Sequence, residues 1–157
     1  QVIRMNEYQK ERFVRRILDS MFNTVSGKRI AILGYAFKKD TNDARESPAI
    51  GICKRLLEEK AHLAIYDPKV SRQTILNSLG IKEDQTNSID FCKSATEACQ
   101  DSHCIAILTE WDEFKNIDYE DIYKNMVKPA ILFDGRNLLD IEMIRSIGFI
   151  AKGIGIS

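Results

Sequence analysis

Short apolar segments of strand length alternate along the chain with segments of helical periodicity, and this alternation limits the folds that the chain can adopt. The apolar segments are residues 29–34, 63–66, 89–92, 104–108, 130–133 and 149–154. Helical patterns lie between them at residues 47–60, 72–79, 95–99, 112–115, 119–126 and 141–146. Parallel strands need a crossover connection, which is usually a helix. The sequence therefore predicts an α/β domain with a doubly wound, mostly parallel sheet and helices on both faces.

The first 25 residues have the pattern of a long amphipathic helix that precedes this sheet. From Val2 to Val25 the apolar residues fall mostly three or four positions apart, with Arg, Lys and Glu between them. Ser26-Gly27 is expected to end the helix, because glycine readily adopts the left-handed conformation found after helix ends. We divide the chain into residues 1–26 and a domain of residues 27–157. The helix carries more apolar surface than one small domain covers, which predicts self-association or an exposed apolar patch.

Charge and composition exclude several classes of function. Lys and Arg total 23, and so do Asp and Glu, so the chain lacks the positive charge that nucleic acid or an anionic membrane attracts. No apolar run reaches the roughly 18 to 20 residues that span a bilayer, and the first residues lack the pattern of a secretory signal. Four cysteines without metal-site or disulfide spacing are expected to be reduced thiols of a cytoplasmic protein. Because a helical pattern is already under way at residue 2, we expect a piece of a longer protein.

The segment after the first apolar run is rich in charge. It begins at Gly34 and carries Lys38, Lys39, Asp40, Asp43, Arg45 and Glu46. Ligands of a doubly wound sheet bind at the carboxyl ends of the strands, where this segment begins. It is not a dinucleotide fingerprint, because Ala36 and Lys39 stand where GxGxxG has its second and third glycines. Cationic side chains would then contact phosphate in place of backbone amides; the alternative is a solvated charged loop.

Three other loops are expected at the same edge of the sheet. Arg136, in a DGRN sequence, is placed either to bind an anionic ligand or to pair with Asp134 or a helix end. Asp67 stands where an acidic residue binds ribose in dinucleotide-binding domains, but without the glycine fingerprint a simple turn is favoured. The segment after the fourth apolar run either forms a wall of the site or starts a helix capped by Thr109 or Asp112.

The sequence offers no catalytic group at this edge. His62 and His103 each precede a predicted strand at the opposite edge, so both are expected to be surface or packing residues. No combination of His, Cys and carboxylate has metal-ligand spacing, and no nucleophile or paired-carboxylate motif is present. These observations indicate a half-site that binds an anion without its own catalytic residues or metal.

Five segments together resemble the C-terminal third of UDP-glucose 6-dehydrogenases, in the nucleotide-sugar dehydrogenase family. They are Phe22-Asn-Thr-Val25, the run KRIAILGYAFKKDTNDARESP at residues 28–48, Tyr66-Asp-Pro-Lys69, Thr109-Glu-Trp-Asp112 and Phe133-Asp-Gly-Arg136. The resemblance implies a Rossmann-like UDP-sugar-binding domain of an NAD-dependent enzyme that oxidises UDP-glucose to UDP-glucuronate in two steps. A dehydrogenase for GDP-mannose or a UDP-N-acetylhexosamine, and a non-catalytic nucleotide-binding module, remain alternatives.

The resemblance also implies roles for particular residues. Phe37 and Lys38 match family positions that contact UDP-glucose, and Arg136 resembles the arginine that reaches the substrate. Arg45 matches the arginine that crosses to NAD, which the family binds mainly with an N-terminal domain. Asn137 departs from the pattern, because animal enzymes tend to carry a second arginine there; if that position contacts the substrate, the assignment to Arg136 is off by one.

Catalysis and assembly are expected to involve more than this chain. The family's catalytic cysteine matches none of the four cysteines here, so the chain alone is expected to be inactive. Residues 1–26 are similar to the end of the family's central helix, which lies at a dimer interface. The resemblance therefore implies a homo-oligomer, with UDP-glucose as the small-molecule partner.

Overall fold

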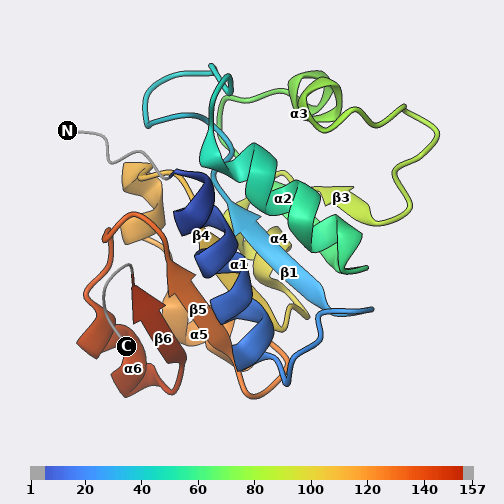
Figure 1. Cartoon of the computed structure of the whole chain (residues 1–157). Helices are drawn as coiled ribbons and strands as arrows, with labels where there is room; N and C mark the ends of the chain where they lie inside the picture. The colour runs from blue at the N-terminus through green and yellow to red at the C-terminus, as the bar shows by residue number, and fades with distance from the viewer. Residues whose placement is uncertain (1–5, 154–157) are drawn as a thin grey trace.

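The computed structural model describes residues 6–153, which form a six-stranded sheet flanked by helices (Figure 1). The strands are β1 (Arg29–Leu33), β2 (His62–Tyr66), β3 (Ile89–Phe91), β4 (Cys104–Ile107), β5 (Ile131–Asp134) and β6 (Ile150–Gly153). Their order in the sheet is β3-β2-β1-β4-β5-β6, and every neighbouring pair is parallel. This is the strand order of a Rossmann fold, so the predicted doubly wound sheet is confirmed.

The two central strands are apolar because both of their faces are covered. All four residues of β4 are buried, as are the four that follow Arg29 in β1. The register places Ile32 of β1 between Ile65 of β2 and Ala106 of β4. A strand that is buried on both faces lacks the alternation of polar and apolar residues seen in a half-exposed strand.

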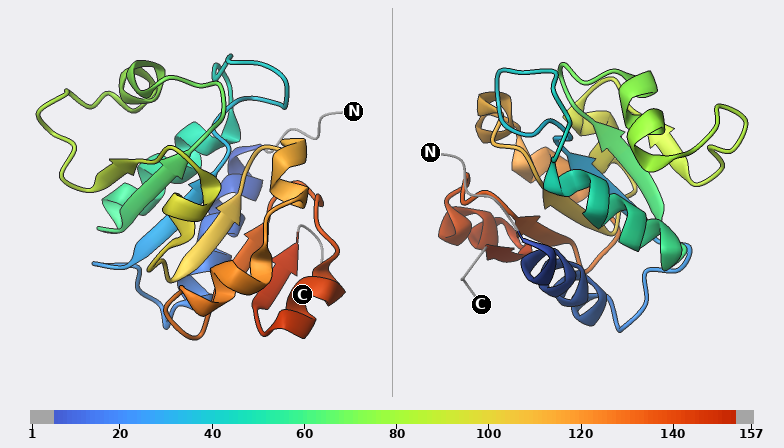
Figure 2. Two further views of the ribbon diagram at one scale, coloured as in Figure 1. Left: turned by 180° about the vertical axis from the view of Figure 1, so that it is seen from behind. Right: turned by 45° about the horizontal axis from the view of Figure 1, so that its top comes forward.

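Helices lie on both faces of the sheet. They are α1 (Glu7–Ser20), α2 (Pro48–Glu58), α3 (Arg72–Leu79), α4 (Ala95–Cys99), the 3₁₀ helix η1 (Asp112–Lys115), α5 (Tyr119–Lys124) and α6 (Ile141–Ile147). In Figure 1, α1 and α2 lie in front of the sheet, and the view from behind in Figure 2 shows α4 and α5 on the opposite face. No helix within residues 6–153 is long and apolar enough to cross a lipid bilayer.

The N-terminal helix is shorter than the sequence predicted. Residues 2–5 lie outside the described residues, and α1 begins after Asn6, whose side chain forms a capping box with the first turn. The helix ends at Ser20 rather than at residues 26–27. Phe22 and Asn23 then adopt φ values of 61° and 65°, in the left-handed region, so the apolar pattern continues beyond the helix itself.

The domain itself covers the apolar face of α1. The buried side chains are Phe13, Val14, Ile17 and Leu18. The Phe13 ring packs edge-on against Phe133 of β5, with ring centroids 5.7 Å apart, and burial of one such side chain contributes about 1.5 to 3 kcal/mol. The face of the helix that meets the sheet is therefore covered within the domain, and the predicted self-association through residues 1–26 stays a prediction. Tyr8 and Phe22, near the two ends of α1, are 73% and 77% exposed.

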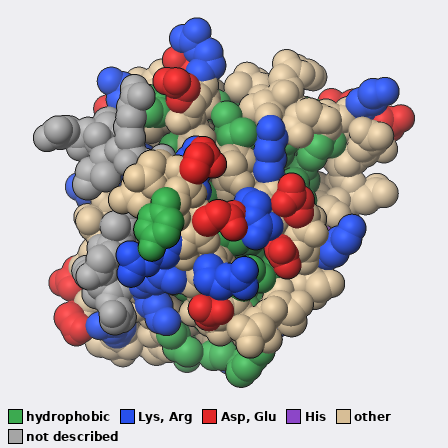
Figure 3. Space-filling model, viewed as in Figure 1, with side chains coloured by type: hydrophobic (Ala, Val, Ile, Leu, Met, Phe, Trp, Pro, Cys, Tyr) green, Lys and Arg blue, Asp and Glu red, His purple; other side chains and the backbone are tan. Residues whose placement is uncertain are grey.

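The outer surfaces of α1 and α2 carry charged side chains of both signs (Figure 3). Arg55 of α2 forms an ion pair with Glu11 of α1, with Nε 2.6 Å from Oε2, and also contacts Glu58 and Glu59. Exposed ion pairs each contribute at most about 1 kcal/mol. Apolar packing, rather than this charge network, therefore holds the two helices on the sheet.

Candidate functional site

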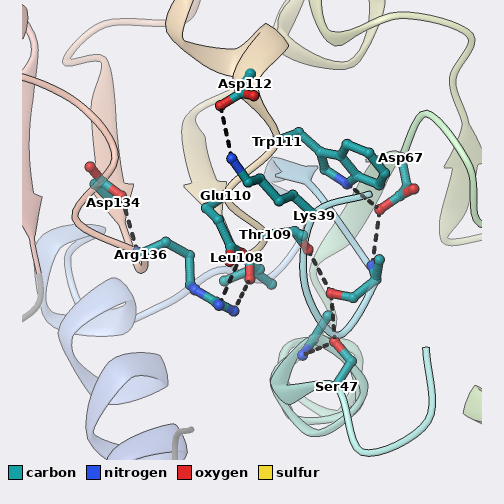
Figure 4. A network of polar contacts seen from close by, with 12 residues as sticks. Lys39, Ser47, Asp67, Leu108, Thr109, Glu110, Trp111, Asp112, Asp134 and Arg136 are labelled. Atoms are coloured by element: carbon teal, nitrogen blue, oxygen red, sulfur yellow. Dashed lines mark hydrogen bonds and ion pairs between the residues drawn. The ribbon is translucent and has the colours of Figure 1, made fainter. Parts of the chain in front are cut away.

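The candidate site lies at the carboxyl ends of β1 and β4, which are neighbours in the centre of the sheet. The chain leaves β1 toward β2 on one side and leaves β4 toward β5 on the other, so the loops after these strands diverge. Ligands of doubly wound sheets bind in the crevice between two such loops. Figure 4 shows that residues after β1, β2, β4 and β5 meet there. The four loops that the sequence placed at one edge are therefore brought together.

Gly34 lets the loop after β1 pass directly against the loop after β4. Its φ is +96°, and a Cβ added there would lie 2.5 Å from Thr109 Cβ and 2.7 Å from the Thr109 nitrogen. Glycine alone suits both this conformation and this close approach. The buried Thr109 hydroxyl donates a hydrogen bond to the Ala36 carbonyl at 2.8 Å. The expectation that Thr109 or Asp112 caps a helix is wrong, since η1 begins without a side-chain cap.

Asp67 accepts hydrogen bonds from the protein's own N–H groups (Figure 4). Its Oδ2 atom accepts from the amides of Tyr35 (2.7 Å) and Ala36 (2.9 Å) and from Trp111 Nε1 (3.1 Å). Its Oδ1 atom accepts from two amides of the turn that follows, at 2.8 and 2.9 Å. The interpretation of Asp67 as a turn residue is confirmed. In addition, the amides after β1, which face phosphate in dinucleotide-binding domains, here face an internal carboxylate.

The loop after β1 carries six charged residues and is called the charged loop here (residues 34–46). Hydrogen bonds close it at its base. The Phe37 amide donates to the Asp43 carbonyl at 2.8 Å. The Ser47 hydroxyl lies 3.4 Å from the Ala36 carbonyl and also caps α2, whose first turn contains Pro48, as the sequence predicted. Residues 38–42 therefore extend from a fixed base.

The three cations of this loop differ in what they contact. Lys38 is exposed, and its ammonium group has no hydrogen-bond or ion-pair partner among residues 6–153. Lys39 Nζ lies 3.5 Å from Asp112 Oδ1. The Arg45 side chain is 89% exposed and donates to both carboxylate oxygens of Asp43 at 3.0 Å. These hydrogen bonds lower the pKa of Asp43 to about 2. The loop thus leaves Lys38 available for a ligand, whereas Arg45 is already paired.

Arg136 lies deeper than the other predicted site residues. Its side chain is 5% exposed; Nη2 lies 2.9 Å from Glu110 Oε1, and Nη1 donates to the Leu108 carbonyl at 3.3 Å. Asp134 accepts a hydrogen bond from the backbone amide of Arg136 rather than from its side chain. The acidic partner of the guanidinium, Glu110, was not predicted. Asn137 is exposed with φ 54°, a conformation that asparagine tolerates.

The predicted residues share an edge but not one pocket. An open pocket of about 740 Å³ lies between the charged loop, α2 and α3, and Arg45 is part of its wall. A second, of about 570 Å³, lies between the same loop and the turn at Pro68. Phe37, which is half-buried, Lys38 and Arg136 line neither of these two pockets. We place the site in the β1/β4 crevice beside them, because the loops cross and the polar contacts converge there.

The histidines and cysteines take no part in these contacts. At the opposite edge, His103 Nδ1 accepts a hydrogen bond from the Arg29 amide at 3.2 Å, and His62 Nε2 lies 3.2 Å from Asp90. All four cysteines are free thiols and three are buried; burial raises the pKa of the fourth, Cys92, to about 11. The predicted packing histidines and reduced thiols are confirmed.

A protein-family model describes most of this chain. Residues 31–141 match the UDP-binding domain of the UDP-glucose/GDP-mannose dehydrogenase family. The chain belongs to this family. The matched range runs from β1 to the start of α6, so it includes all the loops of the candidate site.

Curated relatives are similar to this domain over nearly its whole length. UDP-glucose 6-dehydrogenase 4 of Arabidopsis thaliana is 49% identical, UDP-glucose 6-dehydrogenase 1 of Glycine max 50%, and UDP-glucose 6-dehydrogenase 3 of Oryza sativa subsp. japonica 51%. Each alignment covers 99% of this chain and 35% of the relative, so the chain spans about a third of these proteins' length.

Solved structures of dehydrogenases share the fold. The UDP-D-ManNAc dehydrogenase from Pyrococcus horikoshii is 28% identical, with a TM-score of 0.69 over 93% of this chain and 30% of that one. An NDP-N-acetyl-D-galactosaminuronic acid dehydrogenase from Methanosarcina mazei Go1 is 23% identical, with a TM-score of 0.76 over 96% of this chain and 29% of that one. The fold of this chain is therefore shared with about a third of each of these dehydrogenases.

Proposed function

We propose that this domain binds the nucleotide sugar of an NAD-dependent UDP-glucose 6-dehydrogenase, which oxidises UDP-glucose to UDP-glucuronate. The observation that carries the proposal is the charged loop, which is fixed at its base over the β1/β4 crevice and presents the exposed Lys38 with no partner among residues 6–153. Identities of 49 to 51% to UDP-glucose 6-dehydrogenases over 99% of the chain support UDP-glucose as the ligand.

Lys38 and Arg136 are proposed to contact the diphosphate of UDP-glucose. The Lys38 ammonium carries three N–H donors, and the planar guanidinium of Arg136, which forms an ion pair with Glu110, has N–H groups beyond the one that donates to the Leu108 carbonyl. A guanidinium fork suits phosphate oxygens. Phe37, which precedes Lys38 at the base of the loop, is proposed to contact the same ligand. Glu110 would compete with the ligand for Arg136, because both are anionic.

NAD is proposed to be held mainly by another part of the parent protein. The amides of Tyr35 and Ala36 donate to Asp67 and the loop lacks the glycine fingerprint, so the residues of this domain do not fit a dinucleotide at the β1 loop. The exposed Arg45 is proposed as one contact to NAD, for which it would leave Asp43. The isolated chain is accordingly expected to show no turnover of UDP-glucose with NAD.

A second nucleotide sugar as ligand is the main alternative. The family model covers both UDP-glucose and GDP-mannose dehydrogenases, and the solved structures include a UDP-D-ManNAc dehydrogenase. The curated relatives named above are all UDP-glucose 6-dehydrogenases and share about half of their aligned residues with this chain, which favours UDP-glucose.

We also propose that copies of the parent protein associate through the N-terminal helix, in the cytoplasm. The first part follows from the family resemblance of the N-terminal helix, and Tyr8 and Phe22, which are 73% and 77% exposed, are the apolar side chains available for such a contact. The four free thiols fit a reducing compartment. Sedimentation velocity of wild type and a Tyr8→Ser, Phe22→Ser variant tests the contact; equal sedimentation as monomers would contradict it.

Calorimetric titration tests which nucleotide sugar the chain binds. The chain is titrated with UDP-glucose, UDP-N-acetylglucosamine, GDP-mannose and NAD, and UDP-glucose is expected to bind most tightly. One charge-assisted hydrogen bond contributes roughly 1.5 to 3 kcal/mol to binding. Lys38→Ala is therefore expected to weaken UDP-glucose binding roughly ten- to a hundredfold. Lys60→Ala is the matched control, since Lys60 is an exposed lysine two residues before the start of β2, at the opposite edge. Tighter binding of GDP-mannose, or equal effects of the two lysine variants, would contradict the proposal.

A further inference from the structure

Three N–H groups converge on one oxygen of Asp67, in an arrangement that binds anions in other folds. The donors are the amides of Tyr35 and Ala36 and the indole of Trp111, at 2.7, 2.9 and 3.1 Å from Oδ2. The amides follow β1, the indole follows β4, and the carboxylate follows β2 (Figure 4). A single oxygen thus joins the ends of three adjacent strands.

We propose that Asp67 is a positioning and specificity-determining residue, whose carboxylate acts as an internal anion in this nest of three N–H groups. It holds the start of the charged loop, and it keeps the phosphates of a ligand away from the amides after β1. The positioning role follows from the hydrogen bonds alone. The exclusion of ligand phosphate rests on the proposed nucleotide-binding function.

A neutral side chain of the same size cannot make these contacts. The two oxygens of Asp67 accept five N–H groups in all, three at Oδ2 and two at Oδ1. Asparagine has one oxygen, and its NH₂ group would face N–H donors whichever way the amide is turned. The site therefore needs a carboxylate, rather than a polar side chain that merely fills the space.

The hydrogen bonds of Asp67 also connect it to Phe37 and Lys38, which are proposed to contact the ligand. Both polar groups of the Ala36 backbone are used, since its amide donates to Asp67 and its carbonyl accepts from Thr109. Ala36 directly precedes Phe37 and Lys38. The direction in which the chain enters the charged loop is therefore set by Asp67 on one side and by Thr109 on the other.

Chemical rescue of an Asp67→Ala variant tests the role of the carboxylate. Trp111 is the single tryptophan of the chain and is 6% exposed, so its fluorescence reports on the nest. The variant is expected to unfold at a lower temperature and to show an altered Trp111 emission. Formate is expected to reverse both changes saturably, whereas chloride at equal ionic strength is not. These arms use no nucleotide, so they decide the role of Asp67 even where UDP-glucose fails to bind.

Inorganic phosphate separates an anion nest from a general loss of packing. In Asp67→Ala, phosphate is expected to change Trp111 emission saturably, with at least about tenfold higher affinity than in wild type, because each hydrogen bond to a charged group contributes about 1.5 to 3 kcal/mol. Asp118→Ala is the matched control: Asp118 is an exposed cap of α5 that accepts a single amide at 3.1 Å. Formate is expected to restore nothing in that variant.

An Asp67→Asn variant provides a decisive test if the Asp67→Ala variant does not fold. Hydrogen exchange is expected to lose protection either at the amides of Tyr35 and Ala36 or at those of Lys69 and Val70, since one oxygen serves only one set. Wild-type protection at all four amides would overturn the proposal. So would a folded Asp67→Ala variant with unchanged emission, or one that responds equally to formate and chloride.

Discussion

Replacement of Gly34 by alanine tests how the two central loops are fitted together. The new Cβ would lie 2.5 Å from Thr109 Cβ, 2.6 Å from its Oγ1 and 2.7 Å from its backbone nitrogen. The φ of +96° is also one that L-residues rarely adopt. The nitrogen belongs to the backbone at the end of β4 and cannot rotate away, so the loop itself must move. Gly34→Ala therefore combines a conformational cost with a steric one.

The two costs have separate magnitudes. A non-glycine residue at positive φ costs about 1 to 2 kcal/mol, and overpacking of a filled region costs about 1 to 3 kcal/mol. Together they give a loss of about 2 to 5 kcal/mol, which is a large part of the 5 to 15 kcal/mol typical of a folded domain. Gly80 supplies the control, because its φ is +69° and a Cβ there would meet nothing within 4 Å. Gly80→Ala thus isolates the conformational cost.

Urea unfolding measured by Trp111 fluorescence gives both free energies. Gly34→Ala is expected to lose more stability than Gly80→Ala, and the excess measures the steric contact with Thr109. The same variant is expected to bind UDP-glucose more weakly, because Gly34 opens the loop that carries Lys38. Equal losses at the two glycines, or a Gly34→Ala variant within about 0.5 kcal/mol of wild type, would refute the close approach of the loops.

Three further perturbations address the charges of the domain. In the parent protein, Lys38→Ala is expected to weaken the binding of UDP-glucose and leave the affinity for NAD unchanged, and Arg45→Ala is expected to do the reverse. Calorimetric titrations in which each variant loses equal affinity for both ligands would mean that the loop is structural. Glu110→Gln is expected to lower the free energy of unfolding, because the sheltered Arg136 loses its charged partner, yet to tighten UDP-glucose binding. Urea unfolding at wild-type stability would contradict a stabilising ion pair. Burial and a nearby lysine lower the pKa of His103, so the unfolded chain binds more protons and stability falls as the pH drops below about 6.5. Between about pH 7.5 and 5.5, His103→Asn is expected to lose less stability than wild type, and an equal loss would contradict this role.

The sheet could be predicted from the sequence because its signal is local. Each apolar run is short and bounded by turns, and residues 104–107 all proved to be buried strand. The end of α1 could not be predicted in this way. Met21 and Val25 are buried at helical spacing, yet Phe22 and Asn23 between them are left-handed. That spacing reflects burial against the domain, which a turn achieves as well as a helix does.

The edge that holds the site was predictable, but the partners of its charges were not. Loops that follow parallel strands meet at one edge for topological reasons, so Arg136 and Asp67 could be placed together from the sequence. Their partners, Glu110 and Trp111, are adjacent in the chain. Glu110 forms an ion pair with Arg136 after β5, whereas Trp111 donates a hydrogen bond to Asp67 after β2. A local pattern at residues 109–112 indicates a helix start and contains no sign of either contact. The position of both residues directly after a central strand was the signal that could have found them.

The use of Asp67 as an internal anion changes how this edge of a Rossmann fold can bind a nucleotide. Backbone amides are fixed in place, whereas a lysine must order a flexible side chain, at a cost of about 1.5 to 2 kcal/mol. Lys38 would bear that cost on binding the proposed ligand, and because it is exposed, salt is expected to screen its contribution. Arg136 is already oriented by Glu110 and the Leu108 carbonyl at 5% exposure. If both cations contact the diphosphate as proposed, the sheltered arginine is therefore expected to determine where it lies, and the exposed lysine to add affinity that depends on ionic strength.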